Sequence, residues 1–197
     1  SNAASPPPLP VLAAPWIGPY GGVPAFDKAS PAGLAPAMEA GMARQLVELQ
    51  AIADDPAPAT FENSIAAMER SGRALRRAYT VYGIYGATLS DEAVQAVERD
   101  LEPKLAAFRD QITQNDKLFA RIAAVYDTRA TAGLTAEQQR LTWLTYTDLV
   151  RAGAKLDAAS KTRLAAINQS LAGLFTRFSQ NLLADEGSRF TQLGSEA

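Results

Sequence analysis

The sequence contains neither histidine nor cysteine. Histidine is the usual proton shuttle near neutral pH and the commonest metal ligand, and cysteine is the usual thiol nucleophile and soft metal ligand. A Ser-His-Asp triad, a Cys-His pair, a zinc finger and the two-histidine zinc motif of metallopeptidases are therefore excluded within these 197 residues. Hydrolysis by this chain alone would have to use carboxylates, lysine, tyrosine or serine.

An excess of positive charge and long apolar runs are also missing. Nineteen basic and 21 acidic side chains give a net charge of −2, which argues against electrostatic binding of nucleic acid. No apolar run is long enough to span a bilayer, so we expect neither nucleic acid nor a membrane as a partner. A composition with 47% hydrophobic and 20% charged residues is typical of a globular protein.

The two ends of the sequence indicate a piece of a longer protein. We interpret residues 1–3, Ser-Asn-Ala, as the remnant of a cleaved expression tag. Residues 188–197 follow a long helical pattern and are interpreted as the truncated start of a following element. Because the native part begins without methionine, a removed signal peptide is one candidate for what preceded it. We therefore expect a periplasmic or secreted protein, with a cytoplasmic location as the alternative.

Residues 4–33 form a segment rich in proline and glycine. Proline fixes φ and removes an amide donor, so this segment is expected to be irregular, with extended and turn structure. Trp16, Tyr20 and Phe26 are predicted to pin it onto the folded body, and a ligand-binding loop is the alternative interpretation. The glycines at 18–22 are not followed by Lys-Ser/Thr, so they do not form a phosphate loop.

Residues 34–187 are predicted to form one helical domain. The apolar residues recur at helical spacing almost throughout, and no stretch before the last few residues alternates with a period of two. The fold class is therefore all-α, with about six helices, several of them long, joined by short loops. The expected helices cover about 36–54, 60–86, 90–115, 117–131, 135–151 and 157–184.

Two of these helices carry specific expectations. In the second, the apolar stripe from Phe61 to Gly86 alternates steps of four and three, which predicts one unbroken helix on the order of 40 Å long. Gly72 and Gly86 lie on this stripe and predict close approach of neighbouring backbones. In the third, Pro103 predicts a kink or a break near residues 99–103. The sixth helix has an apolar stripe of its own: Leu164, Ile167, Leu171, Leu174, Phe178 and Leu182.

Three tyrosines in the second helix are candidates for a substrate-lining ladder. Tyr79 and Tyr82 fall on the apolar stripe, so packing in the core explains them first. Tyr85 lies off the stripe and is the better candidate for a surface or channel role.

Four arginines, Arg70, Arg73, Arg76 and Arg77, form the densest basic cluster in the sequence. On an unbroken helix Arg70, Arg73 and Arg77 share one face, opposite much of the apolar stripe. A solvated face is the simpler interpretation. The alternative is an anchor for an acidic group such as a peptide C-terminal carboxylate, which arginine binds through two hydrogen bonds.

Glu98 and Glu102 form a carboxylate pair one helical turn apart, with Asp100 between them. A magnesium site or an acid/base pair would need partners that the spacing does not supply. Arg99 and Lys104 favour an ordinary charged helix face. No motif specifies a reaction, and we assign no catalytic, cofactor-binding or metal-binding residue.

Four segments together resemble one enzyme family. They are 16–27 (WIGPYGGVPAFD), 60–72 (TFENSIAAMERSG), 149–157 (LVRAGAKLD) and 178–185 (FSQNLLAD). In this order they resemble the N-terminal region of the zinc oligopeptidases of the thimet oligopeptidase and neurolysin type. The similarity is greatest to the bacterial peptidyl-dipeptidase (Dcp) branch, with oligopeptidase A next.

The resemblance implies an all-helical protein in which two walls enclose a narrow channel for short peptides. It also implies a zinc ion, Zn2+, held by a His-Glu-x-x-His helix and a further glutamate in the C-terminal part of the full-length parent. This chain ends before that motif, so no catalytic or metal-binding residue is carried over and we expect no cofactor in it. We expect the N-terminal helical channel wall of a zinc-dependent peptidyl-dipeptidase, inactive alone, with short peptides and the missing C-terminal catalytic domain as partners.

Two other functions remain open. The long apolar stripes and the lack of a catalytic motif are also typical of a stand-alone helical module that binds a partner protein or peptide. An enzyme that uses only aspartate and glutamate is a third hypothesis, which the lack of an isolated carboxylate pair disfavours.

Overall fold

The computed structural model describes residues 8–189 and 191, and within them it contains helices and no strand. The all-α prediction is confirmed. The helices are α1 (Pro31–Ala53), α2 (Ala67–Arg70), α3 (Arg73–Thr88), α4 (Glu92–Thr113), α5 (Asp116–Thr128), α6 (Ala136–Arg151) and α7 (Ala158–Ser188). The predictions for residues 1–3 and for most of 188–197 lie outside the described residues.

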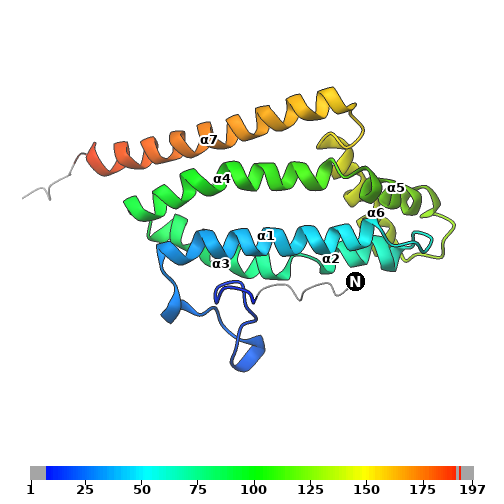
Figure 1. The fold of residues 1–197 in the computed structure, drawn as a ribbon, viewed down its shortest axis with the longest axis horizontal. Helices are drawn as coiled ribbons and strands as arrows, with labels where there is room; N and C mark the ends of the chain where they lie inside the picture. The colour runs from blue at the N-terminus through cyan, green and yellow to red at the C-terminus, as the bar shows by residue number, and fades with distance from the viewer. Residues whose placement is uncertain (1–7, 190, 192–197) are drawn as a thin grey trace, which may run out of the picture.

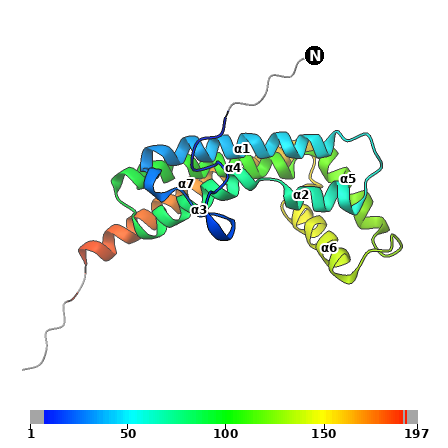
Figure 2. The same ribbon diagram turned by 90° about the horizontal axis from the view of Figure 1, so that it is seen from below.

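Helices α1, α3, α4 and α7 form one elongated body. In Figure 1, α7, α4 and α1 run side by side, and α3 lies against α1. The short α2 gathers with α5 and α6 at one end, where α6 projects away from the body (Figure 2). Side-chain caps fix several helix starts: Asp91, Asn115, Thr135 and Asp157 each accept a hydrogen bond from an amide of the first turn. Asp91, Thr135 and Asp157 lie at the predicted starts, whereas the predicted start of α5 at about 117 lies one residue after the observed one.

The predicted second helix is broken between α2 and α3, so the expectation of one unbroken helix is wrong. Ser71 has an extended backbone, and Gly72 has φ +72°, in the left-handed region. Side chains of α1 hold the break: Gln45 Nε2 donates to Ser71 Oγ over 3.3 Å, and Glu48 Oε2 accepts from Gly72 N over 2.8 Å. These contacts replace the hydrogen bonds that a continuous helix would make.

The predicted close approach of backbones occurs at another glycine. At Gly72 and Gly86 an added Cβ would meet side chains, those of Gln45 and Glu98. At Gly41 of α1, an added Cβ would lie only 2.6 Å from the Cα atom of Leu75 in α3. The backbones of α1 and α3 therefore touch there.

Helix α4 is continuous from Glu92 to Thr113, with Pro103 inside it. The alternative of a break near residues 99–103 is therefore wrong. Proline removes one backbone hydrogen bond, but the packing of α4 between α1 and α7 holds the rest of the helix together.

The main core lies between α1, α3 and α4. Leu34, Met38, Val81 and Leu101 are almost completely buried in it. A smaller core at the α5–α6 end contains the buried side chains of Ile65, Ile122, Val125, Leu149 and Ala154. A third cluster, formed by Leu49, Ala53 and Leu118, lies between them, with Ile112 packed against both this cluster and the main core and Met68 against both this cluster and the smaller core. The apolar packing therefore continues from the long body to the α5–α6 end.

The proline-rich segment reaches the main core through two aliphatic residues. Leu12 and Ala13 are buried, whereas Tyr20 is fully exposed and Phe26 is half exposed. The prediction that the aromatic residues pin this segment is wrong for Tyr20 and Phe26, and only Trp16 is partly buried. Arg77 Nε adds a polar tie by donating to the carbonyl of Ala13 over 3.0 Å.

Candidate functional site: the groove between α4 and α7

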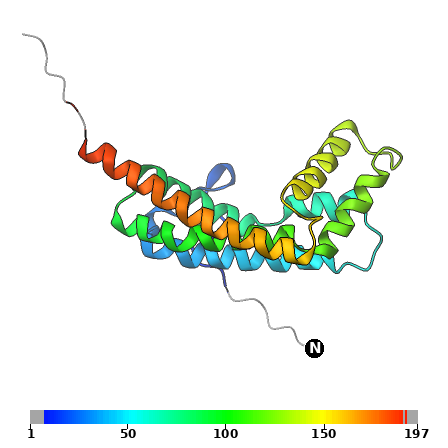
Figure 3. The same cartoon turned by 90° about the horizontal axis from the view of Figure 1, so that it is seen from above.

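A groove lined by charged, polar and apolar side chains lies between α4 and α7. These two helices lie side by side in Figures 1 and 3. The groove is open, with a volume of about 560 Å³. Its lining comprises Glu98, Glu102, Ala106, Arg109 and Asp110 from α4 and Asn168, Leu171, Ala172, Phe175, Thr176 and Ser179 from α7. Residues spaced by three or four positions line each side, because that spacing places them on one face of a helix.

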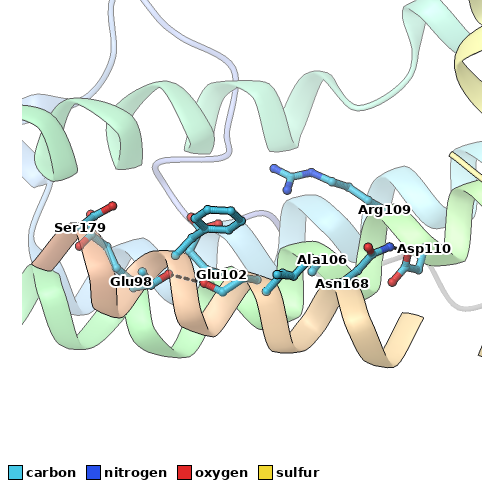
Figure 4. A pocket seen from close by; sticks show the side chains of 11 residues that line it. Glu98, Glu102, Ala106, Arg109, Asp110, Asn168 and Ser179 are labelled. Atoms are coloured by element: carbon cyan, nitrogen blue, oxygen red, sulfur yellow. Dashed lines mark hydrogen bonds between the residues drawn. The ribbon is translucent and has the colours of Figure 1, made fainter. Parts of the chain in front are cut away.

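The carboxylate pair predicted from the sequence lines this groove (Figure 4). Glu102 Oε1 accepts a hydrogen bond of 2.8 Å from the hydroxyl of Tyr82, and Glu98 Oε2 accepts one of 3.1 Å from Gln180 Nε2. Burial, followed by the bond to Glu102, raises the pKa of Tyr82 far above its ordinary value. The two carboxylates therefore link α4 by hydrogen bonds to α3, through Tyr82, and to α7, through Gln180.

A buried carboxylate lies at the other end of the groove. Asp110 is 7% exposed, and its Oδ1 accepts a hydrogen bond of 2.7 Å from Asn168 Nδ2. Its second oxygen is buried without a protein partner. Nearby, the buried Lys161 of α7 pairs with Asp116 over 2.5 Å. These polar contacts hold the N-terminal part of α7 against α4, through Asp110, and against the start of α5, through Asp116.

Sequence reasoning missed Asp110, Asn168 and Lys161. A charged residue within an amphipathic helix is usually exposed, and the sequence offers no signal that another helix covers these three. Only the packing of α7 against α4 and the start of α5 shows that Asn168 bonds to Asp110 and that Lys161 pairs with Asp116.

One face of α7 is apolar and uncovered. Its large side chains are 42–66% exposed: Ile167, Leu171, Leu174, Phe175, Phe178 and Leu182. Lys161 is the buried residue of this 31-residue helix. Four of the apolar side chains, at 171, 174, 175 and 178, line a shallow depression of about 290 Å³. Contiguous exposed apolar surfaces are found where proteins, ligands or membranes bind.

The tyrosines of α3 do not form a ladder. Tyr82 is buried, but Tyr79 is 42% exposed, so packing in the core does not explain Tyr79. Tyr85 is half-buried against the main core and is not the surface residue that the stripe predicts. The break at Gly72 rotates α3 about its axis relative to the preceding turn. The face of α3 that is buried is therefore not the one that an unbroken stripe from Phe61 predicts.

The arginine cluster is divided by the same break. Arg70 belongs to α2 and pairs with Glu62 over 3.4 Å, whereas Arg73, Arg76 and Arg77 belong to α3. The prediction that Arg70 shares one helix face with Arg73 and Arg77 is therefore wrong. The three arginines of α3 line a separate pocket beside Trp16.

The described residues do not offer a site for a transition metal. No group of three or more aspartate or glutamate side chains in residues 8–189 and 191 is arranged to hold an ion. Over the same residues, no helix has both the length and the apolar character that crossing a bilayer requires. The groove contains carboxylates, one arginine and apolar side chains, which suit binding of a polar chain or packing of another surface.

Comparison with known proteins identifies homologous enzymes. No protein-family model matches the sequence. The chain is 35% identical to the dipeptidyl carboxypeptidase of Salmonella typhimurium over 161 residues. This match covers 82% of this chain and 24% of that protein. It is also 35% identical to the dipeptidyl carboxypeptidase of Escherichia coli over 170 residues. That match covers 86% of this chain and 24% of the Escherichia coli protein. The chain is thus homologous to a segment of these enzymes and spans about a quarter of their length.

Proposed function

We propose that this chain is the helical wall of the peptide channel in a zinc-dependent dipeptidyl carboxypeptidase. The homology with the enzymes of Salmonella typhimurium and Escherichia coli carries this proposal. Because the chain matches about a quarter of each relative, the proposed activity belongs to a larger protein in which this chain is one part.

The residues of this chain do not fit a zinc site. The sequence has no histidine or cysteine, and the described carboxylates do not converge in a group of three. Zinc in peptidases is held mainly by histidine with one carboxylate, and it activates a water molecule for attack on the peptide carbonyl. We therefore propose that the metal and its chemistry reside in the remaining part of the enzyme, and that this chain contributes binding surface.

The uncovered face of α7 is the proposed docking surface for that catalytic part. Leu174, Phe175 and Phe178 are more than half exposed on it, and burial of such side chains is worth about 1.5–3 kcal/mol each. The adjoining groove, with Glu98 and Glu102, then lies next to the junction of the two parts. We propose that short peptides contact the wall along this groove.

The test is a hybrid enzyme in which this chain replaces the matching quarter of the Escherichia coli relative. We expect the hybrid to release dipeptides from the C-termini of short peptides, and the chain alone to release none with added zinc. Substitution of both Leu174 and Phe178 by serine should weaken assembly and activity of the hybrid, whereas Gln169→Ser on the polar side of α7 should not.

Two results would contradict the proposal. The first is metal-dependent release of dipeptides by the chain alone. The second is tight binding of peptides or helices by the chain alone with no association with the catalytic part, which would favour the stand-alone binding module.

We also propose a periplasmic or secreted location, with the cytoplasm as the alternative. Lack of cysteine is compatible with both compartments. Fractionation of the native cells, followed by detection with an antibody against this chain, decides between them.

A further inference from the structure

Figure 1 shows the proline-rich segment beside α3, on the side of the bundle away from α7. A second pocket is lined by residues of this segment and of α3. It is open, with a volume of about 400 Å³. Its lining comprises Pro15, Trp16, Gly21, Arg73, Arg76, Arg77 and Thr80. Its position makes it independent of the groove and of the docking surface proposed above.

The pocket gathers three positive charges without a paired carboxylate. Ion pairs occur elsewhere in the described part of the chain, but none involves Arg73, Arg76 or Arg77. Glu48 acts on Arg77 from a distance, but its carboxylate already accepts from Gly72 N over 2.8 Å and pairs with Arg44 over 3.8 Å. Burial, and then the charge of Arg73, lower the pKa of Arg77.

The place of these arginines in the helix adds to the positive potential. Arg73 is the first residue of α3, and Arg76 and Arg77 follow in the next turn, with no acidic residue in the first turn. The unpaired amides at a helix N-terminus carry a partial positive charge, which disfavours cations and favours anions. An anion between these guanidinium groups would reduce their repulsion for one another and their repulsion by the positive end of the helix.

Trp16 forms part of the other wall of the pocket. Trp16 is partly buried, and its indole Nε1 is completely buried without a hydrogen-bond partner in the described structure. Arg77 Nε, which donates to the carbonyl of Ala13, ties the segment to α3 and leaves the two terminal nitrogens of that guanidinium without a recorded protein partner.

We propose that this pocket binds an oxyanion of the phosphate class through the guanidinium groups of Arg73, Arg76 and Arg77. Guanidinium forms paired, charge-assisted hydrogen bonds with phosphate oxygens. A phosphate carries up to two negative charges and can face several arginines at once, whereas a single carboxylate can neutralise only one of the three. The open pocket admits either inorganic phosphate or the phosphate of an ester.

The test is a titration of the ¹⁵N-labelled chain with inorganic phosphate at constant ionic strength, followed by two-dimensional NMR. We expect saturable shifts of the amides of residues 73–77 and of the Trp16 indole N–H, which Trp143→Phe distinguishes from the other indole. Arg76→Gln should weaken phosphate binding at least about tenfold, the factor expected for one charged hydrogen-bonding group. Parallel titration with phenyl phosphate tells whether a free or an esterified phosphate binds better.

The matched control is Arg163→Gln, which removes an exposed arginine from the second turn of α7 and should leave phosphate binding unchanged. Arg76→Lys keeps the charge and loses the paired geometry, so it should bind with intermediate affinity. Absence of saturable shifts, equal binding by Arg76→Gln and the unmodified chain, or tighter binding of acetyl-dialanine than of phosphate would each overturn the proposal. Circular dichroism verifies that each variant retains its helices.

Discussion

Helices α1 and α7 both contain apolar residues at helical spacing but differ in their surroundings. Each has an apolar stripe at helical spacing, yet α1 buries seven residues, whereas α7 buries only Lys161. The reason is visible in Figure 1: α1 lies among α3, α4 and the α5 end, whereas α7 packs mainly against α4 and reaches the start of α5 through the Lys161–Asp116 ion pair. The comparison shows that an amphipathic stripe marks a face suited to burial and does not say whether this chain supplies the cover.

The largest expected effect comes from matched leucine truncations in the two helices. Leu34 in α1 is 1% exposed and Leu174 in α7 is 52% exposed. Leu34→Ala should lower the free energy of unfolding by about 2–5 kcal/mol because it leaves a cavity. Leu174→Ala should change it by less than about 1 kcal/mol. Urea denaturation monitored by circular dichroism measures both, and equal losses would mean that α7 is covered in the isolated chain.

A pair of glycine substitutions should change stability in opposite directions. Gly41→Ala places a Cβ 2.6 Å from the backbone of Leu75, so we expect a loss of about 1–3 kcal/mol. Gly173→Ala in α7 meets nothing within 4 Å, and it should gain about 0.5–1 kcal/mol from helix propensity. Thermal unfolding of the two variants compares them, and a loss at Gly173 would reveal a neighbour packed on α7.

The free energy of unfolding should also depend on pH because of the buried Tyr82. The pKa of this tyrosine is raised in the folded state above its ordinary value of 10.0. The unfolded tyrosine then ionises first, so the folded state is favoured below that value and stability falls as the pH rises above it. Urea denaturation from pH 9 to about pH 11.5 should show a steeper loss for the unmodified chain than for Tyr82→Phe. Parallel curves would mean that Tyr82 is accessible to solvent.

The smallest expected change in stability accompanies the removal of an exposed aromatic from α7. Phe178 is 66% exposed, so Phe178→Ser should alter the free energy of unfolding by no more than about 0.5 kcal/mol. It should nevertheless reduce association of the isolated chain at high protein concentration, since it interrupts the apolar face. Sedimentation velocity over a concentration series measures this, with Gln169→Ser as the control. Identical sedimentation of both variants would show that this face does not drive association.

Local sequence signals predicted the helices well where a cap or a turn fixed the boundary. Asp91, Thr135 and Asp157 bond to amides within their own first turn, so a few neighbouring residues suffice to specify those starts. The break at Gly72 was not predicted because its partners, Gln45 and Glu48, lie more than 20 residues away in the sequence.

In the candidate site, too, contacts within one helix could be predicted from the sequence, whereas contacts between helices could not. The pairing of Glu98 with Glu102 along one helix was evident from their spacing, but their partners Tyr82 and Gln180 come from two other helices. Asp110 gave no signal, because nothing in its own helix shows that Asn168 of α7 reaches it.

The sequence by itself determined the helical class and excluded histidine- and cysteine-based chemistry, since composition and periodicity are properties of the chain alone. The tertiary structure decided which apolar stripe is buried, where the long second helix breaks, and which arginines gather beside Trp16. The physical reason is that burial and polar pairing depend on neighbours that are distant in sequence. For α7, the structure leaves the stripe open, and this is where we propose that the catalytic part docks.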